Sequence, residues 1–334
     1  MSRRIPGRSR IGGWLASIGI VTLAAWLAGR VCTDRFSWSQ PLYWIPTSVA
    51  MASASLLLLA ATFGCRGRHA WGRRFVLATS LIAATAWALV VEWRVFRLRG
   101  APLQGLPVRV MHWNLAADTI DGIAGFISRF HPDIAVLCNP PMRRDEKLES
   151  ALGFDARAAS IGHLLILIKG EVIERRFVSL GLNAHRAGMD PARDGPGAID
   201  HGWAAWFVAS LHHAPEPLTF WVIDLPNDPT RRRMAMLADA ARVLREHAFP
   251  DPDVIVGDFN TPRGSDSLSF IIGNLRESHA TAGFGTGASW PRRFPLWAID
   301  LTFVREGIDI DRSRIVIPAG GTHAVQVVDL VVPP

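Results

Sequence analysis

The sequence predicts an α/β protein in which a mixed sheet covered by helices follows three apolar helices that cross a membrane. Apolar stretches of membrane-spanning length gather in the first hundred residues. Strand-like runs and helical patterns are interleaved through the remainder, which is typical of a sheet with helices packed on its faces. Polar residues follow the ends of several of those strands, where α/β sheets place their ligands.

The apolar stretches cover about residues 11–29, 42–64 and 75–93. Each approaches the roughly 20 residues that a helix needs to cross a hydrocarbon core of ~30 Å. Tryptophans lie mostly near their ends, as interfacial aromatics do. A cleaved signal peptide is disfavoured because two further stretches follow the first and no small-residue cleavage site is clear. We therefore expect residues 1–99 to be a membrane anchor whose partner is the lipid bilayer, and we infer no obligate protein partner.

Arginines in the short flanks predict the orientation of this anchor. Clusters of arginine precede the first stretch and separate the second from the third: Arg3, Arg4, Arg8, Arg10, Arg66, Arg68, Arg73 and Arg74. The first loop holds only Arg30 and Arg35 against Asp34. The positive-inside rule then puts the N-terminus in the cytoplasm, and three crossings leave the following domain outside it, at the cell (inner) membrane. Three arginines after the third stretch argue the other way: Arg94, Arg97 and Arg99.

The overall composition adds little about partners. The formal net charge is +7, and much of the positive charge lies beside the apolar stretches, so membrane topology accounts for it more simply than a nucleic-acid partner. Arginine greatly outnumbers lysine, which suggests a bacterial source with a GC-rich genome. Cys32, Cys65 and Cys138 show neither a metal-ligand spacing nor a disulfide framework.

A linker over residues 100–106 is rich in glycine and proline, and residues 107–334 are long enough for one substantial core. Helical patterns fit residues 120–130 and 230–247, and the segment 183–202 is predicted as a long loop. Eight runs are predicted as strands: residues 108–113, 134–138, 163–169, 204–211, 219–225, 254–256, 298–304 and 325–332.

The most informative of these strands ends in Gly257, Asp258 and Asn260. Residues i and i+2 of an extended chain project to the same side, so the carboxylate of Asp258 and the carboxamide of Asn260 are expected to point together from the strand end. A charged acceptor beside an amide donor suits a water or a metal held next to a phosphate. The structural alternative is an ordinary turn, since Asp, Asn and Gly all favour turns.

Further fragments stand in order around this strand. They are Val108-Arg109-Val110-Met111-His112-Trp113-Asn114-Leu115, Pro132-Asp133-Ile134-Ala135-Val136-Leu137, Gly257-Asp258-Phe259-Asn260-Thr261, Ser289-Trp290-Pro291, Ala298-Ile299-Asp300-Leu301-Thr302-Phe303-Val304 and Gly321-Thr322-His323-Ala324-Val325. In order and spacing this set resembles the endonuclease/exonuclease/phosphatase superfamily, and specifically its membrane-anchored bacterial members. The resemblance covers about residues 106–333. It implies a four-layer α/β sandwich with two facing mixed sheets, and hydrolysis of a phosphate ester by an activated water with a divalent metal, Mg²⁺ or Mn²⁺.

The resemblance also implies roles for the matching positions. Asn114 would position metal or phosphate, Asp258 would orient or deprotonate the attacking water, and Asn260 would hold a phosphate oxygen. His323 would hydrogen-bond the phosphoryl group, with Asp300 fixing its tautomer. A histidine does need a partner on its other nitrogen to be held in one tautomer, and developing charge on a phosphoryl group does need fixed donors and a cation.

Three positions depart from the family pattern. Asn139 stands where a metal-binding glutamate is usual, Thr322 where an aspartate precedes the final histidine, and Asp224 where a His or Tyr contacts phosphate. Since Mg²⁺ prefers carboxylate oxygens, these losses weaken the metal set of Asn114, Asn139 and Asp258.

Two accounts follow from these departures. The site is rebuilt with Asp224 and with residues of the long loop, namely His185, Asp190, Asp194, Asp200 or His201. Alternatively, the domain is a catalytically impaired binding module. We expect a membrane-tethered phosphoesterase whose substrate is nucleic acid, a phospholipid or a small phosphoester, and we keep the binding module as the alternative. Three other features are interpreted structurally: His112 as packing, Cys138 as core, and the run Arg231-Arg232-Arg233 as a solvated helix face.

Overall fold

A computed structural model describes residues 7–64, 68–97, 104–116, 122–140, 153–161, 163–185, 189, 193, 199–212 and 214–333. The chain divides into two compact units, Met1–Arg97 and Leu98–Pro334. Most of the predicted linker, residues 100–106, falls outside the described residues.

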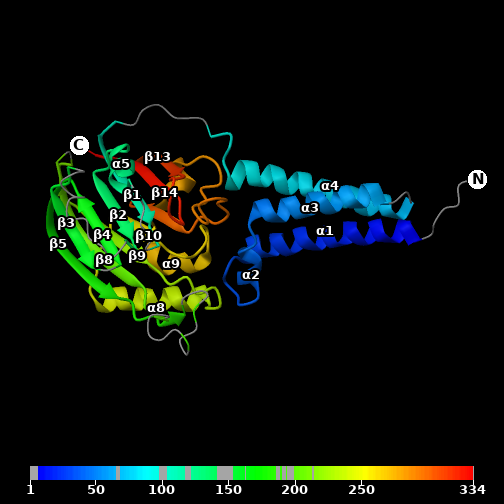
Figure 1. Ribbon diagram of the computed structural model, residues 1–334, viewed down its shortest axis with the longest axis horizontal. Helices are drawn as coiled ribbons and strands as arrows, with labels where there is room; N and C mark the ends of the chain where they lie inside the picture. Colours follow the sequence, from blue (N-terminus) through cyan, green and yellow to red (C-terminus); the bar gives the residue numbers. More distant parts are fainter. Residues whose placement is uncertain are drawn as a thin grey trace, which may run out of the picture. The chain divides into compact units, whose positions relative to one another are not determined.

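The first unit is helical. It consists of α1 (Gly7–Cys32), the short α2 (Ser39–Tyr43), α3 (Thr47–Gly64), α4 (Arg68–Trp87) and a π-helical turn, η1 (Ala88–Glu92), that continues α4. The three long helices α1, α3 and α4 pack side by side (Figure 1).

Two of these helices are long and apolar enough to span a membrane, over Ile11–Cys32 and Trp71–Glu92. The middle of the three predicted stretches, 42–64, does not form a helix of this length. Pro46 cannot continue a helix from the preceding turn, so α2 ends at Tyr43 and α3 begins at Thr47. The remaining apolar helix, Thr47–Phe63, is shorter than its two neighbours.

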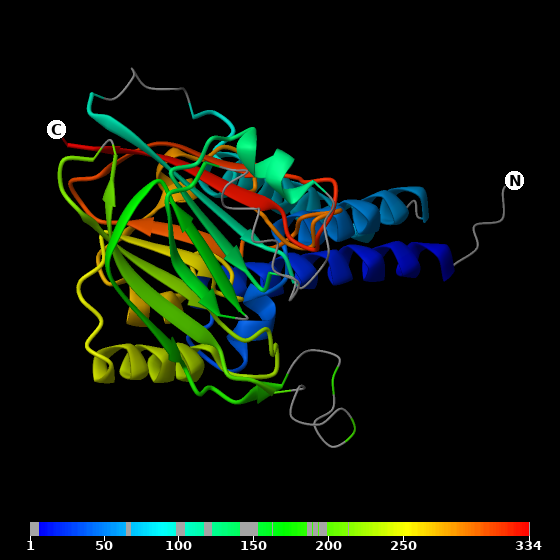
Figure 2. The ribbon, with the colours of Figure 1, turned by 60° about the vertical axis from the view of Figure 1, so that its left-hand side comes forward.

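The second unit contains two six-stranded mixed sheets that face each other (Figure 2). In sheet A the order is β13 (Asp309–Val316), β14 (Val325–Val332), β1 (Leu106–Asn114), β2 (Ile134–Cys138), β4 (Leu164–Ile168) and β3 (Ala156–Ile161). In sheet B it is β11 (Arg276–Glu277), β12 (Asp300–Val304), β10 (Val254–Asp258), β9 (Leu218–Asp224), β8 (Trp203–Leu211) and β5 (Gly170–Ser179). Among the described strands of these two sheets, only the pairs β1–β2 and β9–β10 are parallel.

Helices cover the outer faces of both sheets. On sheet A, α5 (Ile123–Ser128) buries Ile127 against Met111 and Trp113. On sheet B, α8 (Arg233–Glu246) and α9 (Ser269–Ile272) pack their apolar residues on Ile223, Ile255 and Leu301. A third cluster fills the space between the sheets, with Val110, Val136, Phe220 and Val256 among its members. The predicted α/β fold with two facing mixed sheets flanked by helices is therefore confirmed.

Smaller elements complete this unit. They are the two-stranded pair β6 (Ala184–His185) and β7 (Ile199–Asp200), the 3₁₀ turn η3 (Asp266–Leu268) and α10 (Ser278–Ala282). The β6–β7 pair forms at the base of the segment 183–202, which the sequence predicts as a loop.

Candidate functional site

Three carboxylates stand abreast on neighbouring strands of sheet B. Asp258, the last residue of β10, pairs with Asp224 at the end of the parallel β9 and with Asp300 at the start of the antiparallel β12. Residues directly opposite in a sheet project to the same face, so the three side chains share one face. Gly257 allows this close pairing, because a Cβ there would lie 1.8 Å from the carbonyl oxygen of Ile223.

Sheet A brings Asn114 against this row. Asn114 is the last residue of β1, and its Nδ2 donates to Asp258 Oδ2 over 2.7 Å. Its Oδ1 accepts the backbone N–H of Ala116 at 2.9 Å. The other oxygen of Asp258 accepts the backbone N–H of Asn260 at 2.8 Å. Both oxygens of Asp258 therefore have a donor, and Asp258 is completely buried.

Asn139 joins the cluster from the end of β2. Its Nδ2 lies 3.1 Å from Asp224 Oδ2 and 3.4 Å from Asn114 Oδ1, so one amide group bridges two oxygens that belong to different sheets. Asn139 has a left-handed backbone with φ of 47°, a conformation that Asn tolerates better than Glu. The residue that replaces the expected glutamate thus lies beside Asp224, which supplies a carboxylate from the opposite sheet.

A histidine–aspartate pair forms the far side of the site. His323 precedes β14, and its Nδ1 lies 2.9 Å from Asp300 Oδ2 and 3.9 Å from Asp258 Oδ2. Asp300 receives a second anchor, since its backbone N–H donates to Ser289 Oγ at 3.3 Å. With its Nδ1 held by Asp300, His323 keeps Nε2 as the nitrogen available to a ligand.

Burial and mutual repulsion raise the pKa of two of the carboxylates. Burial, followed by the charge of Asp300, raises the pKa of Asp258 to about 7. Burial, followed by the charges of Asp258 and Asp200, raises the pKa of Asp224 well above its usual value. Acidic groups with such shifts favour either a bound proton or a bound cation.

The pKa of Asp300 is lowered, in contrast to the raised pKa values of Asp224 and Asp258. Burial alone would raise the pKa of Asp300, but the charge and the hydrogen bond of His323 outweigh it and lower that pKa. For His323, burial opposes the charged form, yet the charge and hydrogen bond of Asp300 raise its pKa to about 9. At neutral pH this pair is therefore an imidazolium beside a carboxylate.

Asn260 and Thr322 both have partners outside the carboxylate row. The side chain of Asn260 donates from Nδ2 to the backbone carbonyl of Leu225 over 2.7 Å, so it ties the end of β10 to the end of β9. Thr322 is exposed, and its carbonyl accepts the backbone N–H of Arg292 at 2.7 Å. Thr322 therefore offers the carboxylate row nothing in place of the aspartate.

Of the loop residues that were considered for a rebuilt site, Asp200 is the one that influences the carboxylate row. Asp200, in β7, is close enough to Asp224 for its charge to raise that pKa. His201 is exposed, and its Nδ1 lies 2.6 Å from Asn183 Oδ1. His185 is placed by its backbone N–H, which donates to Asp228. Asp190 and Asp194 lie outside the described residues.

The solvated-face interpretation is wrong for Arg233, whereas His112 is buried as expected and also lies beside the site. Arg233, expected on a solvated helix face, is fully buried and donates to the carbonyl oxygens of Pro226 and Asp228. His112 is only 1% exposed and lies against Asp300. The available signal for His112 was its spacing from Asn114, because residues i and i+2 of a strand lie on the same face.

The donor atoms of this cluster fit a hard divalent cation. Carboxylate oxygens of Asp224 and Asp258 and amide oxygens of Asn114 and Asn139 are the ligand types that Mg²⁺ and Mn²⁺ prefer. The pKa values of both aspartates are raised because burial destabilises their charged forms, and a bound cation would stabilise those forms. Asp258, Asp300 and His323 also place one potential ligand atom each within 4.8 Å of one another. We favour the first set, because Asp300 already holds His323.

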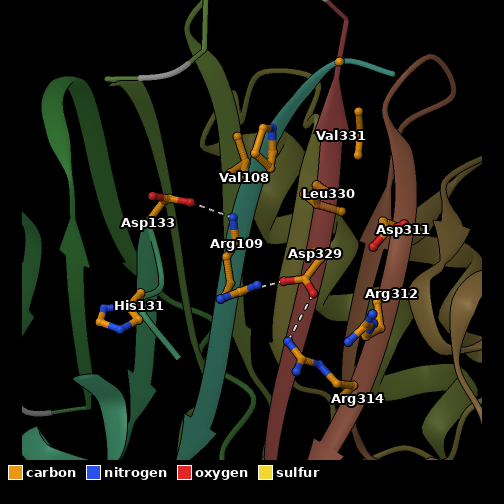
Figure 3. A pocket seen from close by; sticks show the side chains of 12 residues that line it. Val108, Arg109, His131, Asp133, Asp311, Arg312, Arg314, Asp329, Leu330 and Val331 are labelled. Carbon is orange, nitrogen blue, oxygen red and sulfur yellow. Dashed lines mark hydrogen bonds and ion pairs between the residues drawn. The ribbon is translucent and has the colours of Figure 1, made fainter. Parts of the chain in front are cut away.

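A separate pocket of about 540 Å³ lies on sheet A at the end where β1 begins, away from Asn114 (Figure 3). Arg109 and Arg314 both bind the carboxylate of Asp329, at 2.5 and 3.1 Å. The three arginines that line the pocket, Arg109, Arg312 and Arg314, are matched by the same number of aspartates, including Asp329. The pocket is thus balanced in charge and contributes nothing to the carboxylate row.

Several solved structures share this fold. An endonuclease/exonuclease/phosphatase family protein from Bacteroides thetaiotaomicron has a TM-score of 0.54 at 16% identity, covering 70% of this chain and 100% of its own. The mannosyl-6-phosphatase of Bacteroides thetaiotaomicron VPI-5482 has a TM-score of 0.52 at 16% identity, with 67% and 99% covered. D. rerio TDP2 in complex with a single-strand DNA product has a TM-score of 0.51 at 11% identity, with 67% and 98% covered.

No curated protein was found to match the sequence. The model of the Endonuclease/Exonuclease/phosphatase family, however, matches residues 111–323, which is more than half of the chain. This stretch runs from the first strand of sheet A to His323 and contains every residue of the cluster described above. The chain therefore belongs to the endonuclease/exonuclease/phosphatase family, whose members are hydrolases that include phosphatases and nucleases.

Proposed function

We propose that this protein is a membrane-tethered phosphoesterase that uses a divalent cation and an activated water to hydrolyse a phosphodiester or phosphomonoester. One observation carries the proposal. The carboxylate row of Asp224, Asp258 and Asp300 meets Asn114 and the His323 imidazolium at a single place between the two sheets. Anionic oxygens that can hold a cation and a water thus lie next to a cationic donor for a phosphoryl oxygen.

Asp258 is the group that acts on water in this proposal. It lies between Asp224 and Asp300, and a pKa of about 7 lets it take a proton near neutral pH. The donors on its two oxygens, from Asn114 and the backbone of Asn260, fix the orientation of its carboxylate. Asp258 therefore has a carboxylate of fixed orientation and a pKa suited to accepting a proton from water near neutral pH.

His323 is the group that meets the phosphoryl oxygens. Its raised pKa keeps it protonated at neutral pH, so Nε2 can donate a charge-assisted hydrogen bond. Asp300 holds the ring through Nδ1 and compensates its charge. Such a preorganised donor stabilises charge that develops on the phosphoryl group during hydrolysis.

Asp224, Asp258, Asn114 and Asn139 would hold the Mg²⁺ or Mn²⁺. When bound, the cation would supply positive charge to the phosphate and to the water. The proposal thus assigns Asp224 the carboxylate role that Asn139 cannot fill. The hydrogen bond from Asn139 to Asp224 supports this assignment, because it brings the ends of β2 and β9 together.

A binding module without turnover is the second candidate. It is favoured by the Asn139 amide, which bridges Asp224 and Asn114 where a carboxylate would add charge, and by the exposed Thr322. In that case the site would bind a phosphate ester through His323 and would not cleave it.

The tether rests on the two apolar helices of spanning length in the first unit. We place the domain outside the cytoplasm, at a bacterial inner membrane, because the arginines around the first-unit helices favour a third crossing by the shorter α3. A substrate that lies at a surface, such as a phospholipid, is compatible with a tethered enzyme, as are nucleic acid and small phosphoesters.

Turnover by the full-length chain in detergent tests the proposal. Generic phosphodiester and phosphomonoester substrates are assayed with Mg²⁺, with Mn²⁺ and with a chelator, beside Asp258→Ala and His323→Ala. Cation-dependent hydrolysis that both substitutions abolish is the expected result. A folded chain that binds a phosphate ester through His323 but never turns it over would establish the binding module instead.

A further inference from the structure

A second histidine lies against the Asp300 carboxylate, opposite His323. His112 reaches this place from β1, and its Nδ1 lies 3.5 Å from Asp300 Oδ1. Both of these atoms are buried, and neither has a hydrogen-bond partner among the residues that the structure describes. The other oxygen of Asp300 is the one that holds His323 at 2.9 Å. Asp300 is therefore flanked by two imidazole rings, one at each oxygen.

The other nitrogen of His112 indicates where its proton lies. Nε2 of His112 is 3.4 Å from Cys138 Sγ, in the buried layer between the sheets. A thiol can donate its hydrogen, though weakly. If Nε2 accepts from the thiol, the single proton of a neutral imidazole lies on Nδ1, facing Asp300.

We propose that His112 is a positioning residue, which donates from Nδ1 to Asp300 Oδ1 and so holds the carboxylate that orients His323. The inference rests on the proposed phosphoesterase function. It explains why His323 Nδ1 stays at Asp300 and not at Asp258, whose Oδ2 is only 3.9 Å away. Without a donor to Oδ1, the Asp300 carboxylate could rotate. His323 could then turn to Asp258 and form a hydrogen bond with the carboxylate that is needed as the general base.

Two substitutions separate a donor role from a packing role. His112→Leu removes the donor and keeps an apolar side chain of moderate size, whereas His112→Asn keeps an N–H near the position of Nδ1. For the full-length protein in detergent we expect His112→Leu to lower kcat by about tenfold with little change in KM, the scale found when a partner that orients a functional side chain is lost. His112→Asn is expected to recover most of the lost kcat.

A readout that needs no turnover is the Nδ1 proton of His323, observed by NMR after labelling histidines with ¹⁵N. Its signal is assigned by its loss in His323→Gln. We expect the resonance to shift or broaden in His112→Leu and to return in His112→Asn. If His112→Leu does not fold, Cys138→Ala removes the donor to Nε2, and we expect it to shift the same proton by a smaller amount.

The outcomes are distinct. If every folded variant had the kcat of the unaltered protein and the same resonance of the His323 Nδ1 proton, the positioning role of His112 would be overturned. Equal loss in His112→Leu and His112→Asn would show that ring shape, and not the donor, matters, and would also overturn it. A chain without turnover in which the His323 proton still responds to His112 would defeat the proposed hydrolysis and leave the positioning role standing.

Discussion

Asp258 is the residue whose removal should cost the most activity. Asp258→Asn keeps the size of the side chain but removes the basic oxygen that would take a proton from water. We expect kcat to fall by about 10²- to 10⁴-fold, the range attributed to a positioned general base. The matched control is Asp251→Asn, since Asp251 is exposed and precedes the start of β10, whereas Asp258 is the last residue of that strand. Equal activity of the two variants would remove Asp258 from the mechanism.

The pH dependence of kcat/KM follows from two residues with opposite requirements. Asp258 must be ionised to act as a base, and its raised pKa makes activity rise as the pH increases through about 7. His323 must be protonated to donate, so activity falls as the pH increases through about 9. The expected profile is a bell between these values. Saturating cation should move its acidic limb to lower pH, because a nearby positive charge favours the carboxylate, and His323→Gln should eliminate the alkaline limb.

Asp224 can be tested without any substrate. If it holds a cation, Mn²⁺ at a hundred times its Kd should stabilise the folded chain by about 2.7 kcal/mol. Thermal unfolding should show this as a rise in Tm that is lost in Asp224→Asn and retained in Asp251→Asn. A rise of equal size in all three proteins would place the cation elsewhere.

The sequence predicts the site residues that lie at the ends of strands. It does not predict the contacts that form between side chains of the two facing sheets. Asp258, Asp300, His323 and Asn114 each come with a strand or a recognisable motif. That Asn139 lies 3.1 Å from Asp224, 85 residues away, depends on how the two sheets face each other. His112 was interpreted as packing for the same reason, since its neighbour Asp300 belongs to sheet B.

At the scale of the elements, every predicted strand exists, and the strands that were missed lie at sheet edges. The longer missed strands are β3, β5 and β13, each the outermost strand of its sheet and each with a register shift. A bulge shifts the alternation of side chains by one residue. Edge strands also carry charge that discourages further pairing, as Glu171, Glu174, Arg175 and Arg176 do in β5. Both effects erase the period-two pattern that identifies a strand in sequence.

The N-terminus of α8 depends on a buried arginine. The guanidinium of Arg233 donates to the carbonyl oxygens of Pro226 and Asp228, in the segment that follows Asp224. Arg233→Met keeps much of the apolar stem but leaves two buried acceptors without these donors. We expect a loss of about 2–6 kcal/mol in unfolding free energy, at about 1–3 kcal/mol for each of the two unsatisfied groups. Chemical denaturation checks this, with Arg242→Met on the exposed face of α8 as the control. Equal stability of the two variants would show that water or other donors replace the guanidinium.

At the scale of the whole molecule, the side of the membrane on which the domain lies depends on how many helices cross. If α1 and α4 alone cross, an even number of crossings returns the domain to the side of the N-terminus. If α3 crosses as well, the domain lies on the opposite side. The 18 residues of α3 rise about 27 Å at 1.5 Å per residue, a little less than a hydrocarbon core of ~30 Å.

The arginines on either side of α3 lead us to expect that α3 crosses the membrane. Arg66 lies between α3 and α4, and Arg68, Arg73 and Arg74 follow in the first turns of α4. The segment between α1 and α3 has Arg35 balanced by Asp34. The positive-inside rule opposes leaving the first group outside, and α3 packs along both α1 and α4. A reporter that is active only outside the cytoplasm, fused after residue 104, should therefore be active, and one fused after Arg66 should be silent. Converting Arg66, Arg68, Arg73 and Arg74 to Gln should weaken this difference. Silence at residue 104 in the unaltered chain would mean that α3 does not cross and that the phosphoesterase site faces the cytoplasm.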